Sequence, residues 1–271
     1  NRSAYAESSA KHLEACIEVS SKFAKHLESV GEKFINSDSD LSSAWKVVTD
    51  SKNFTSMNAE ARSHFGQTVV KKLSKLGAKS IPPEQYEQRK AAFLKAVTFK
   101  LKAGNKGGHG VSTRQELSHE DIERTHGYAA EFFDAFGPIA ERSLGRVKDM
   151  LIMPVGSLRN FNFQDGFNFD DKRTFFHEFG HSIEHYLSEA KDLTGASYWA
   201  ARIKGRDKGP LRKLRDLAPG SRYANDEMCL PDEWAHLYMS KVYPHGSTEV
   251  VSSLCESVGG DVHGGWPGQV K

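Results

Sequence analysis

The feature that most constrains this chain is a segment with helical spacing at 170–190, which holds two histidines four residues apart. His177, Glu178 and His181 form the pattern H-E-x-x-H within it. Other residues recur with helical spacing, at Phe176, Gly180, Ile183 and Leu187. Residues four apart on an α-helix lie one turn above each other on one face, so both imidazoles can reach one tetrahedral metal ion from a rigid support.

The acid inside this pattern points to catalysis. Glu178 borders the same helical face, and a carboxylate beside a zinc ion can take a proton from zinc-bound water and return it to a leaving amine. A structural zinc site needs no such base and usually closes its fourth position with Cys or His, whereas this pattern leaves one position open for water. The sequence therefore predicts a zinc metallopeptidase that hydrolyses peptide bonds with Glu178 as general base.

The residues around the pattern argue against the alternative, an exposed polar helix. Phe175, Phe176 and Phe179 are aromatic residues that a buried helix requires and a solvated one does not. Gly180 weakens a helix by about 1 kcal/mol relative to alanine. We therefore expect another part of the backbone to approach closely at Gly180.

His185 extends the same helical face, but it does not fit as a third ligand. A straight helix separates positions 177 and 185 by about 12 Å, at 1.5 Å per residue. The metzincin pattern H-E-x-x-H-x-x-G-x-x-H is also absent, because Glu184 and Leu187 occupy its glycine and last histidine positions. The remaining ligand must come from downstream.

Five downstream acids are candidates for that ligand: Asp226, Glu227, Asp232, Glu233 and Glu249. The first two lie in a polar stretch that Pro231 closes, which is typical of a loop or hairpin. The next two occupy the first turn of an expected helix, where the helix dipole favours acids without any metal. Glu249 also lies near a helix start, so the residues alone leave the choice open.

Several segments after residue 149 carry a resemblance to a known family. They read TFFHEFGH, PLRKLRDLAPGSRY, PDEWAHLY and STEVVSS. Together the stretch 149–256 resembles the zincin-like metallopeptidase domains of phage and mobile-element structural proteins. The resemblance implies a zincin fold with His177 and His181 as zinc ligands, Glu178 as base and Glu249 as third ligand.

Two further features concern the substrate. A tetrahedral oxyanion needs a nearby hydrogen-bond donor, and the candidates are Tyr238 and Tyr243, with His236 and His245 behind them. For either tyrosine the alternative is a half-buried position in the core. RNFNF, at 159–163, is either an edge strand to which an extended peptide can add or an ordinary core strand.

The order of expected elements indicates a mostly helical α+β protein. Helical spacing covers 3–34, 59–76 and 83–102, and it returns at 119–136 and 138–147. A short apolar run at 149–155 then indicates a buried strand before the motif helix. We therefore predict a small sheet within a largely helical chain.

The domain division follows from a glycine-rich stretch at 102–112, the best candidate for a linker. We predict a helical N-terminal region at 1–105, a zincin-like catalytic domain at 113–258 and a glycine-rich tail at 259–271. The N-terminal helices are the expected surface for an assembly partner. Because the chain begins with Asn1 and not Met, we expect it to be a processed or excised part of a longer protein.

The composition of the chain limits its expected binding partners and its expected cellular location. The chain has 37 basic and 35 acidic residues and a net charge of +2, which gives no reason to expect a nucleic-acid or membrane partner. Its three cysteines are odd in number and widely spaced, which favours a reducing compartment over a secreted disulfide framework. With the resemblance to phage and mobile-element proteins, this implies a cytoplasmic or virion-associated location over secretion. We expect a peptide or protein substrate and a Zn²⁺ cofactor. The alternatives are a zincin-shaped structural or assembly protein of a phage or mobile element, with lost or incidental peptidase activity, and a helical binding module with a small metal-stabilised domain.

Overall fold

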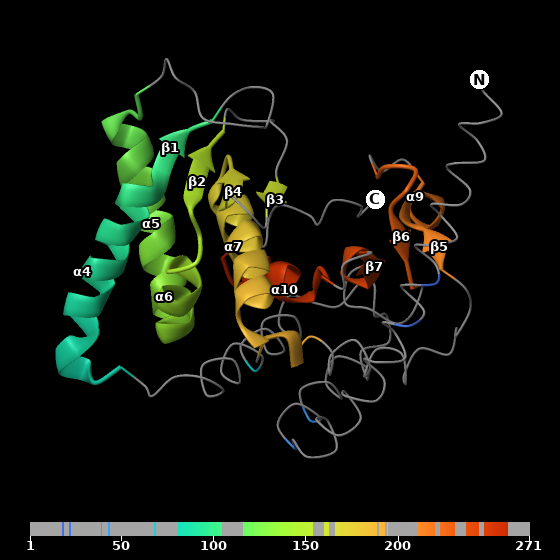
Figure 1. Ribbon diagram of the computed structural model, residues 1–271, viewed down its shortest axis with the longest axis horizontal. Coiled ribbons are helices and arrows are strands. Elements are labelled where there is room, and N and C mark those ends of the chain that lie inside the picture. The colour runs from blue at the N-terminus through green and yellow to red at the C-terminus, as the bar shows by residue number, and fades with distance from the viewer. Residues whose placement is uncertain are drawn as a thin grey trace. The chain divides into compact units, whose positions relative to one another are not determined.

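The computed structural model describes residues 81–104, 116–153, 160–162, 166–188, 190–192, 194, 211–219, 223–230, 237–243 and 247–259, with residues 18, 22, 39, 43 and 68. Helices predominate in this part of the chain and two small sheets accompany them (Figure 1), so the predicted mostly helical α+β class is confirmed at that level. The expected helices at 3–34 and 59–76 lie outside the described residues, apart from single positions.

The chain forms two compact units. The motif unit comprises Gly66–Lys191 and Val251–Val262. The downstream unit comprises Asn1–Phe65, Asp192–Val250 and His263–Lys271. The predicted division at 1–105, 113–258 and 259–271 stays a prediction, and the two units are described separately below.

The motif unit contains a four-stranded sheet in the order β1-β2-β4-β3. Its strands are β1 (Leu101–Ala103), β2 (Asp149–Ile152), β3 (Asn160–Asn162) and β4 (Gly166–Phe169). The first three in that order run parallel, and β3 pairs antiparallel with β4 at the end of the sheet. The strands expected at 149–155 and 159–163 are confirmed over Asp149–Ile152 as β2 and over Asn160–Asn162 as β3, whereas β4 was not predicted.

Among the elements that the structure bounds in full, five helices belong wholly or mainly to this unit: α4 (Pro83–Lys100), α5 (His119–Phe136), α6 (Pro138–Leu144), α7 (Lys172–Tyr186) and α10 (Val250–Gly259). They confirm the helices expected at 119–136 and, for most of its length, at 138–147. The expectation of helix through residue 102 is wrong at its end, because the chain passes directly from α4 into β1. In β1, Leu101 and Ala103 are buried on either side of the half-buried Lys102, which is the alternation of a strand.

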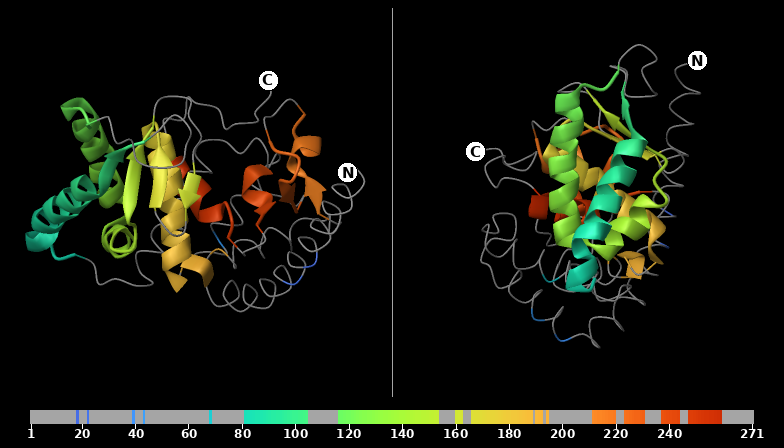
Figure 2. Two further views of the ribbon diagram at one scale, coloured as in Figure 1. Left: turned by 45° about the horizontal axis from the view of Figure 1, so that its top comes forward. Right: turned by 90° about the vertical axis from the view of Figure 1, so that its left-hand side faces the viewer.

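Phenylalanine rings from several elements fill the core of this unit. The ring of Phe179 on α7 lies 4.3 Å from that of Phe132 on α5 and 5.6 Å from that of Phe167 on β4, between centroids. Figure 2 shows α4 and α5 side by side, and Phe93 of α4 also reaches Phe179. Burying one such side chain contributes about 1.5–3 kcal/mol. The expected burial of Phe175, Phe176 and Phe179 is confirmed, so α7 is a core helix.

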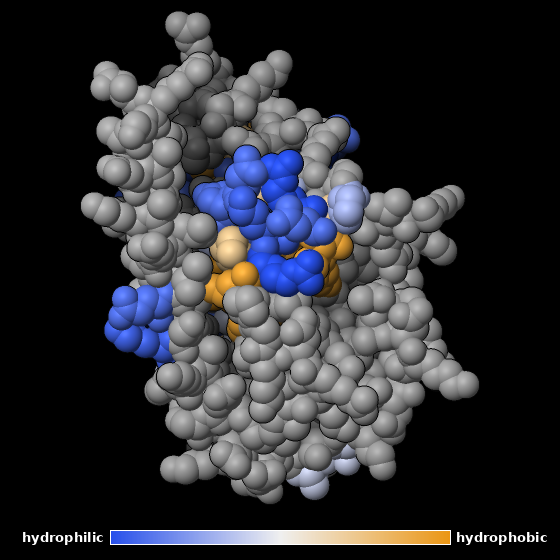
Figure 3. All heavy atoms as spheres, turned by 90° about the vertical axis from the view of Figure 1, so that its right-hand side faces the viewer, coloured by the Kyte–Doolittle hydropathy of each residue, from blue (hydrophilic) through white to orange (hydrophobic). Residues whose placement is uncertain are grey.

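The downstream unit holds an antiparallel sheet in the order β5-β6-β7. Its elements are β5 (Arg212–Lys213), α9 (Leu214–Leu217), β6 (Met228–Cys229), the 3-10 helix η2 (Leu237–Ser240) and β7 (Lys241–Val242). Asp226 and Glu227 lie just before β6, in the connection between two paired strands, so the expected loop or hairpin is confirmed. In the space-filling view of Figure 3, the surface of the described residues is mostly hydrophilic beside a smaller hydrophobic area.

Two further properties of the described residues concern membrane-spanning helices and cysteines. None of their helices is long and apolar enough to cross a membrane. Cys229 and Cys255 are both buried free thiols. Burial, with a smaller contribution from Glu184, raises the pKa of the Cys255 thiol above its usual value. Both cysteines therefore serve as small apolar core residues in this structure.

Candidate metal centre

The first turn of α7 is fixed by hydrogen bonds just ahead of the motif. The backbone N–H of Thr174 donates to Asp171 Oδ1 at 2.7 Å, and the backbone N–H of Asp171 donates to Thr174 Oγ1 at 3.1 Å. This reciprocal capping box satisfies two backbone donors, and an N-cap of this kind contributes about 1 kcal/mol. The helix that carries His177 therefore starts at a defined residue and in a defined direction.

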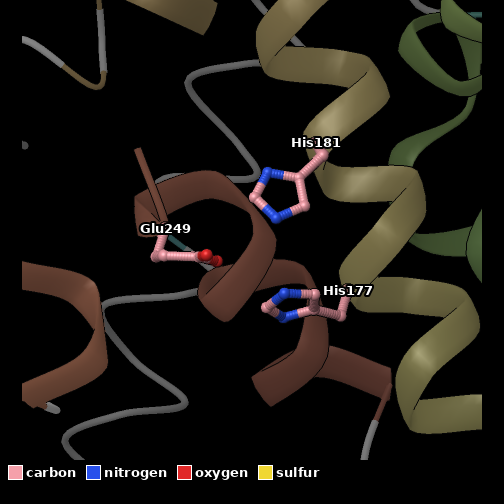
Figure 4. Close-up of side chains that lie close together, drawn as sticks. All are labelled: His177, His181 and Glu249. Carbon is pink, nitrogen blue, oxygen red and sulfur yellow. The ribbon is translucent and has the colours of Figure 1, made fainter. Parts of the chain in front are cut away.

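The structure brings His177, His181 and Glu249 together. One potential ligand atom from each residue lies within 4.8 Å of the other two. The two imidazole centroids are 5.0 Å apart. Figure 4 shows both rings leaving the same side of α7 and the carboxylate pointing toward them. The three residues predicted as ligands thus form one cluster, and no other His, Cys, Asp or Glu among the described residues joins it.

Glu249 owes its place to α10, because it immediately precedes the first residue of that helix. From Val251 onward α10 belongs to the motif unit. A Cβ added to Gly180 would lie only 2.6 Å from Ser252 Cα, and one added to Gly259 would meet the ring of Phe176. Residue numbers rise along one helix as they fall along the other, so α7 and α10 pack antiparallel. The close backbone approach expected at Gly180 is confirmed.

The donor set fits zinc. Two imidazoles and one carboxylate are three protein donors of the types that zinc accepts, and three donors leave coordination positions open. Glu249 is 1% exposed, and a buried carboxylate is costly unless it is paired, hydrogen-bonded or bound to a metal. The two histidines are half-buried, so the cluster lies at the edge of the core.

Glu178, the expected general base, lies on α7 between the two histidines of the cluster in sequence. Glu178 is 5% exposed and directly follows His177 in the helix. Its carboxylate is not part of the cluster of three. Its expected role as general base is compatible with this position and stays a prediction.

His185 and the other acids take other positions. His185 is not part of the cluster, and burial together with nearby Lys191 lowers the pKa of its imidazole. Asp226 is exposed, and Glu227 Oε1 accepts from Lys241 Nζ at 2.7 Å. The remaining predicted candidates, Asp232, Glu233, His236 and His245, lie outside the described residues.

Tyr243 holds the carboxylate of Glu249. Its hydroxyl donates a hydrogen bond to Glu249 Oε1. Burial, followed by the negative charge of Glu249, raises the pKa of Tyr243 far above its usual value. The phenol therefore stays protonated at neutral pH and remains a donor. Its predicted catalytic role stays untested, but this contact gives it a second use, which is to fix one oxygen of a candidate ligand.

Lys241 is a buried cation that sequence reasoning missed. Its Nζ lies 3.8 Å from Glu249 Oε1 and 3.1 Å from Tyr238 Oη, and it sits over the rings of Tyr238 and Tyr243. With Glu227 also bound to it, the ammonium is well compensated. Burial and the nearby acids raise the pKa of Tyr238 as well. No spacing rule in the sequence links Lys241 to Glu249, since β7 and α10 are separate elements.

Glu256 is a second residue that sequence reasoning missed. Its Oε2 lies 2.9 Å from His177 Nδ1, and its Oε1 lies 3.0 Å from Arg173 Nε in an ion pair. A signal for it was available, because Glu256 follows Glu249 by two helical turns and so lies on nearly the same face of α10. Arg173 likewise precedes His177 by one turn of α7.

No protein-family model matches the chain, and comparisons with curated proteins and with solved structures also found no match. A functional interpretation therefore depends on the residues themselves and on their arrangement. The convergence of His177, His181 and Glu249 is the strongest observation of that kind.

Proposed function

We propose that this protein is a zinc-dependent peptidase of the zincin type, with His177, His181 and Glu249 as the zinc ligands and Glu178 as the general base. The observation that carries the proposal is the grouping of three potential ligand atoms within 4.8 Å. Helical spacing accounts for the two histidines, but it does not account for an acid from a distant part of the chain. Two imidazoles and one carboxylate make up a known ligand set of catalytic zinc.

The chemistry divides between the metal and the protein. A zinc ion held here would act as a Lewis acid toward a peptide carbonyl and would lower the pKa of a bound water. Glu178 accepts the proton of the attacking water on its carboxylate and passes that proton to the nitrogen of the leaving amine. Tyr243 and Lys241 hold Glu249 in place by a hydrogen bond and by charge. Tyr238 remains a candidate donor to the oxyanion.

The sheet of the motif unit supports a peptide as substrate. β3 is the last strand in the order of its sheet, and none of the strands that the structure describes pairs with its other edge. Its partner β4 ends at Phe169, three residues before α7 begins at Lys172. An extended peptide can add to such an edge through main-chain hydrogen bonds. The substrate we propose is therefore an extended segment of a peptide or protein.

The test separates metal binding from hydrolysis. His177→Ala and His181→Ala should abolish zinc binding in metal analysis of the purified protein. Glu178→Gln should retain zinc but reduce the turnover of a peptide library by about 10²–10⁴-fold, the usual contribution of a general base. Glu184→Gln is the matched control, because Glu184 is also a buried acid on α7 but lies outside the cluster.

Two outcomes would change the proposal. If Glu178→Gln lost zinc as completely as the histidine variants do, Glu178 would be a ligand and the assigned roles would be wrong. Zinc binding by the unmodified protein without hydrolysis of any peptide would favour the zincin-shaped structural or assembly protein instead.

A further inference from the structure

We propose that Glu256, anchored by Arg173, is a positioning residue that fixes the tautomer and orientation of His177, so that Nε2 is the nitrogen presented to the metal. The metal itself rests on the function proposed above. The contact that orients the ring does not, because it is made by the protein alone.

The contact joins the two helices that bear the cluster. Glu256 lies on α10, and Arg173 and His177 lie one turn apart on α7. One carboxylate oxygen of Glu256 is 2.9 Å from His177 Nδ1, and the other is 3.0 Å from Arg173 Nε. Both oxygens are thus engaged by α7, and the carboxylate has little freedom to turn away.

Burial strengthens this arrangement. The side chains of Glu256 and His177 are 11% and 14% exposed, and that of Arg173 is 24% exposed. Water competes weakly for hydrogen bonds at such positions, so they are stronger than on an open surface. The carboxylate also faces a guanidinium that compensates its charge, which reduces the cost of keeping it in this partly buried place.

The tautomer follows from the donor and acceptor roles. A neutral imidazole has one N–H and one nitrogen lone pair, whereas an ionised carboxylate can only accept hydrogen bonds. The nitrogen that faces Glu256 must therefore carry the hydrogen, which makes it Nδ1–H. The lone pair is left on Nε2, and a lone pair is what a metal requires. A carboxylate behind a histidine ligand generally orients the ring and raises its basicity.

An ordinary ion pair between two helices is the competing explanation. In that case Arg173 and Glu256 would join α7 to α10, and the contact with His177 would be incidental. The chain offers a matched pair of that kind, since Arg89 Nε donates to Glu141 Oε1 at 3.1 Å between α4 and α6 of the same unit. Glu141 is not part of the cluster, so its loss should affect the helices alone.

The experiment uses the full chain and two readouts. Zinc affinity is measured by competition with a chromophoric chelator, for Glu256→Met, Glu256→Gln and the control Glu141→Gln. Methionine fills a similar volume without an acceptor, whereas glutamine keeps one neutral acceptor oxygen. We expect Glu256→Met to bind zinc about 10–100-fold more weakly, the usual loss for a residue behind a ligand. Glu256→Gln should recover part of that loss, and Glu141→Gln should be unchanged.

The second readout is the tautomer of His177 in the metal-free protein, from ¹⁵N-histidine NMR, with its signal identified by its absence in His177→Ala. We expect the Nδ1–H form in the unmodified protein and a mixture or the Nε2–H form in Glu256→Met. An Nε2–H form in the unmodified protein would overturn the proposal without recourse to any variant. The proposal would also be overturned if Glu256→Met had the same zinc affinity and the same His177 tautomer as the control Glu141→Gln. A protein that binds no zinc but shows the expected tautomers would refute the proposed function and leave the positioning role standing.

Discussion

Replacing Gly180 by alanine tests the contact on which the candidate site depends. The new Cβ would lie 2.6 Å from Ser252 Cα and 3.1 Å from Ser252 N, whereas ordinary contact begins at 3.4 Å. The obstacle is backbone, so no side-chain rotation can relieve it. Either α10 moves away from α7 by a large part of an ångström, or the core deforms.

Two opposing effects set the size of the change. Alanine favours a helix over glycine by about 1 kcal/mol, whereas overpacking costs about 1–3 kcal/mol. Because the clash is with backbone, we take the upper end of that cost and expect the free energy of unfolding to fall by about 2 kcal/mol. Zinc affinity should also fall, since α7 carries two ligands and Glu249 precedes α10, while zinc–ligand distances tolerate shifts of only about 0.2 Å.

The chain supplies a matched control in Gly127, which lies inside α5 with no atom within 4 Å of an added Cβ. Gly127→Ala should therefore stabilise the protein, by up to about 1 kcal/mol. Chemical denaturation followed by circular dichroism compares the two variants, and chelator competition measures their zinc affinity. If Gly180→Ala were as stable as Gly127→Ala and bound zinc equally well, α7 and α10 would not be in close contact and the reasoning would fail.

Three further predictions concern single side chains. Glu249→Ala should weaken zinc binding by more than about 100-fold, beyond the loss typical for a residue behind a ligand, and Glu227→Ala should weaken it far less. A larger loss of zinc affinity in Glu227→Ala than in Glu249→Ala would refute the assignment of Glu249 as a ligand. Tyr243→Phe should weaken zinc binding severalfold because Glu249 loses a donor, whereas a lower kcat at unchanged zinc affinity would support a catalytic hydroxyl instead. Burial and a hydrogen bond to Asp134 raise the pKa of Tyr86 from 10 to about 12. The protonated phenol therefore contributes its full stabilisation below pH 10, and this contribution is lost as the pH rises to 12. Tyr86→Phe should flatten that part of the plot of stability against pH, and an unchanged plot would contradict the shift.

Much of the motif unit was predictable because its helices carry strong local patterns. The spacing at 119–136 matches α5, and the four-residue spacing of His177 and His181 places both on one face of α7. Gly180 also predicted the close approach of another backbone segment, which is α10 in the structure. Local patterns of this kind depend on residues within one or two turns of each other.

The parts that were missed depend on residues far apart in sequence. β1 follows α4 without a break, and only its pairing with β2 makes it a strand. β4 is a short segment, GFNF, buried on both faces, so it lacks the alternation that marks a half-exposed strand. The contacts of Lys241 with Glu227 and Glu249 join different elements, and no spacing rule reports them. For Glu256 the sequence offered one signal, its spacing of two helical turns from Glu249. Glu249 itself was selected by resemblance and not by its local sequence.

The antiparallel contact of α7 and α10 has a thermodynamic consequence. Between the end of α7 and Glu249 the chain forms the strands of the downstream unit. A zinc ion bound as proposed would crosslink the two ends of this long segment. Binding free energy would then be folding free energy, adding about 2.7 kcal/mol when free zinc is 100 times its Kd. Chelation would remove this contribution, whereas the packing of α7 against α10 would remain because the protein makes it without the metal.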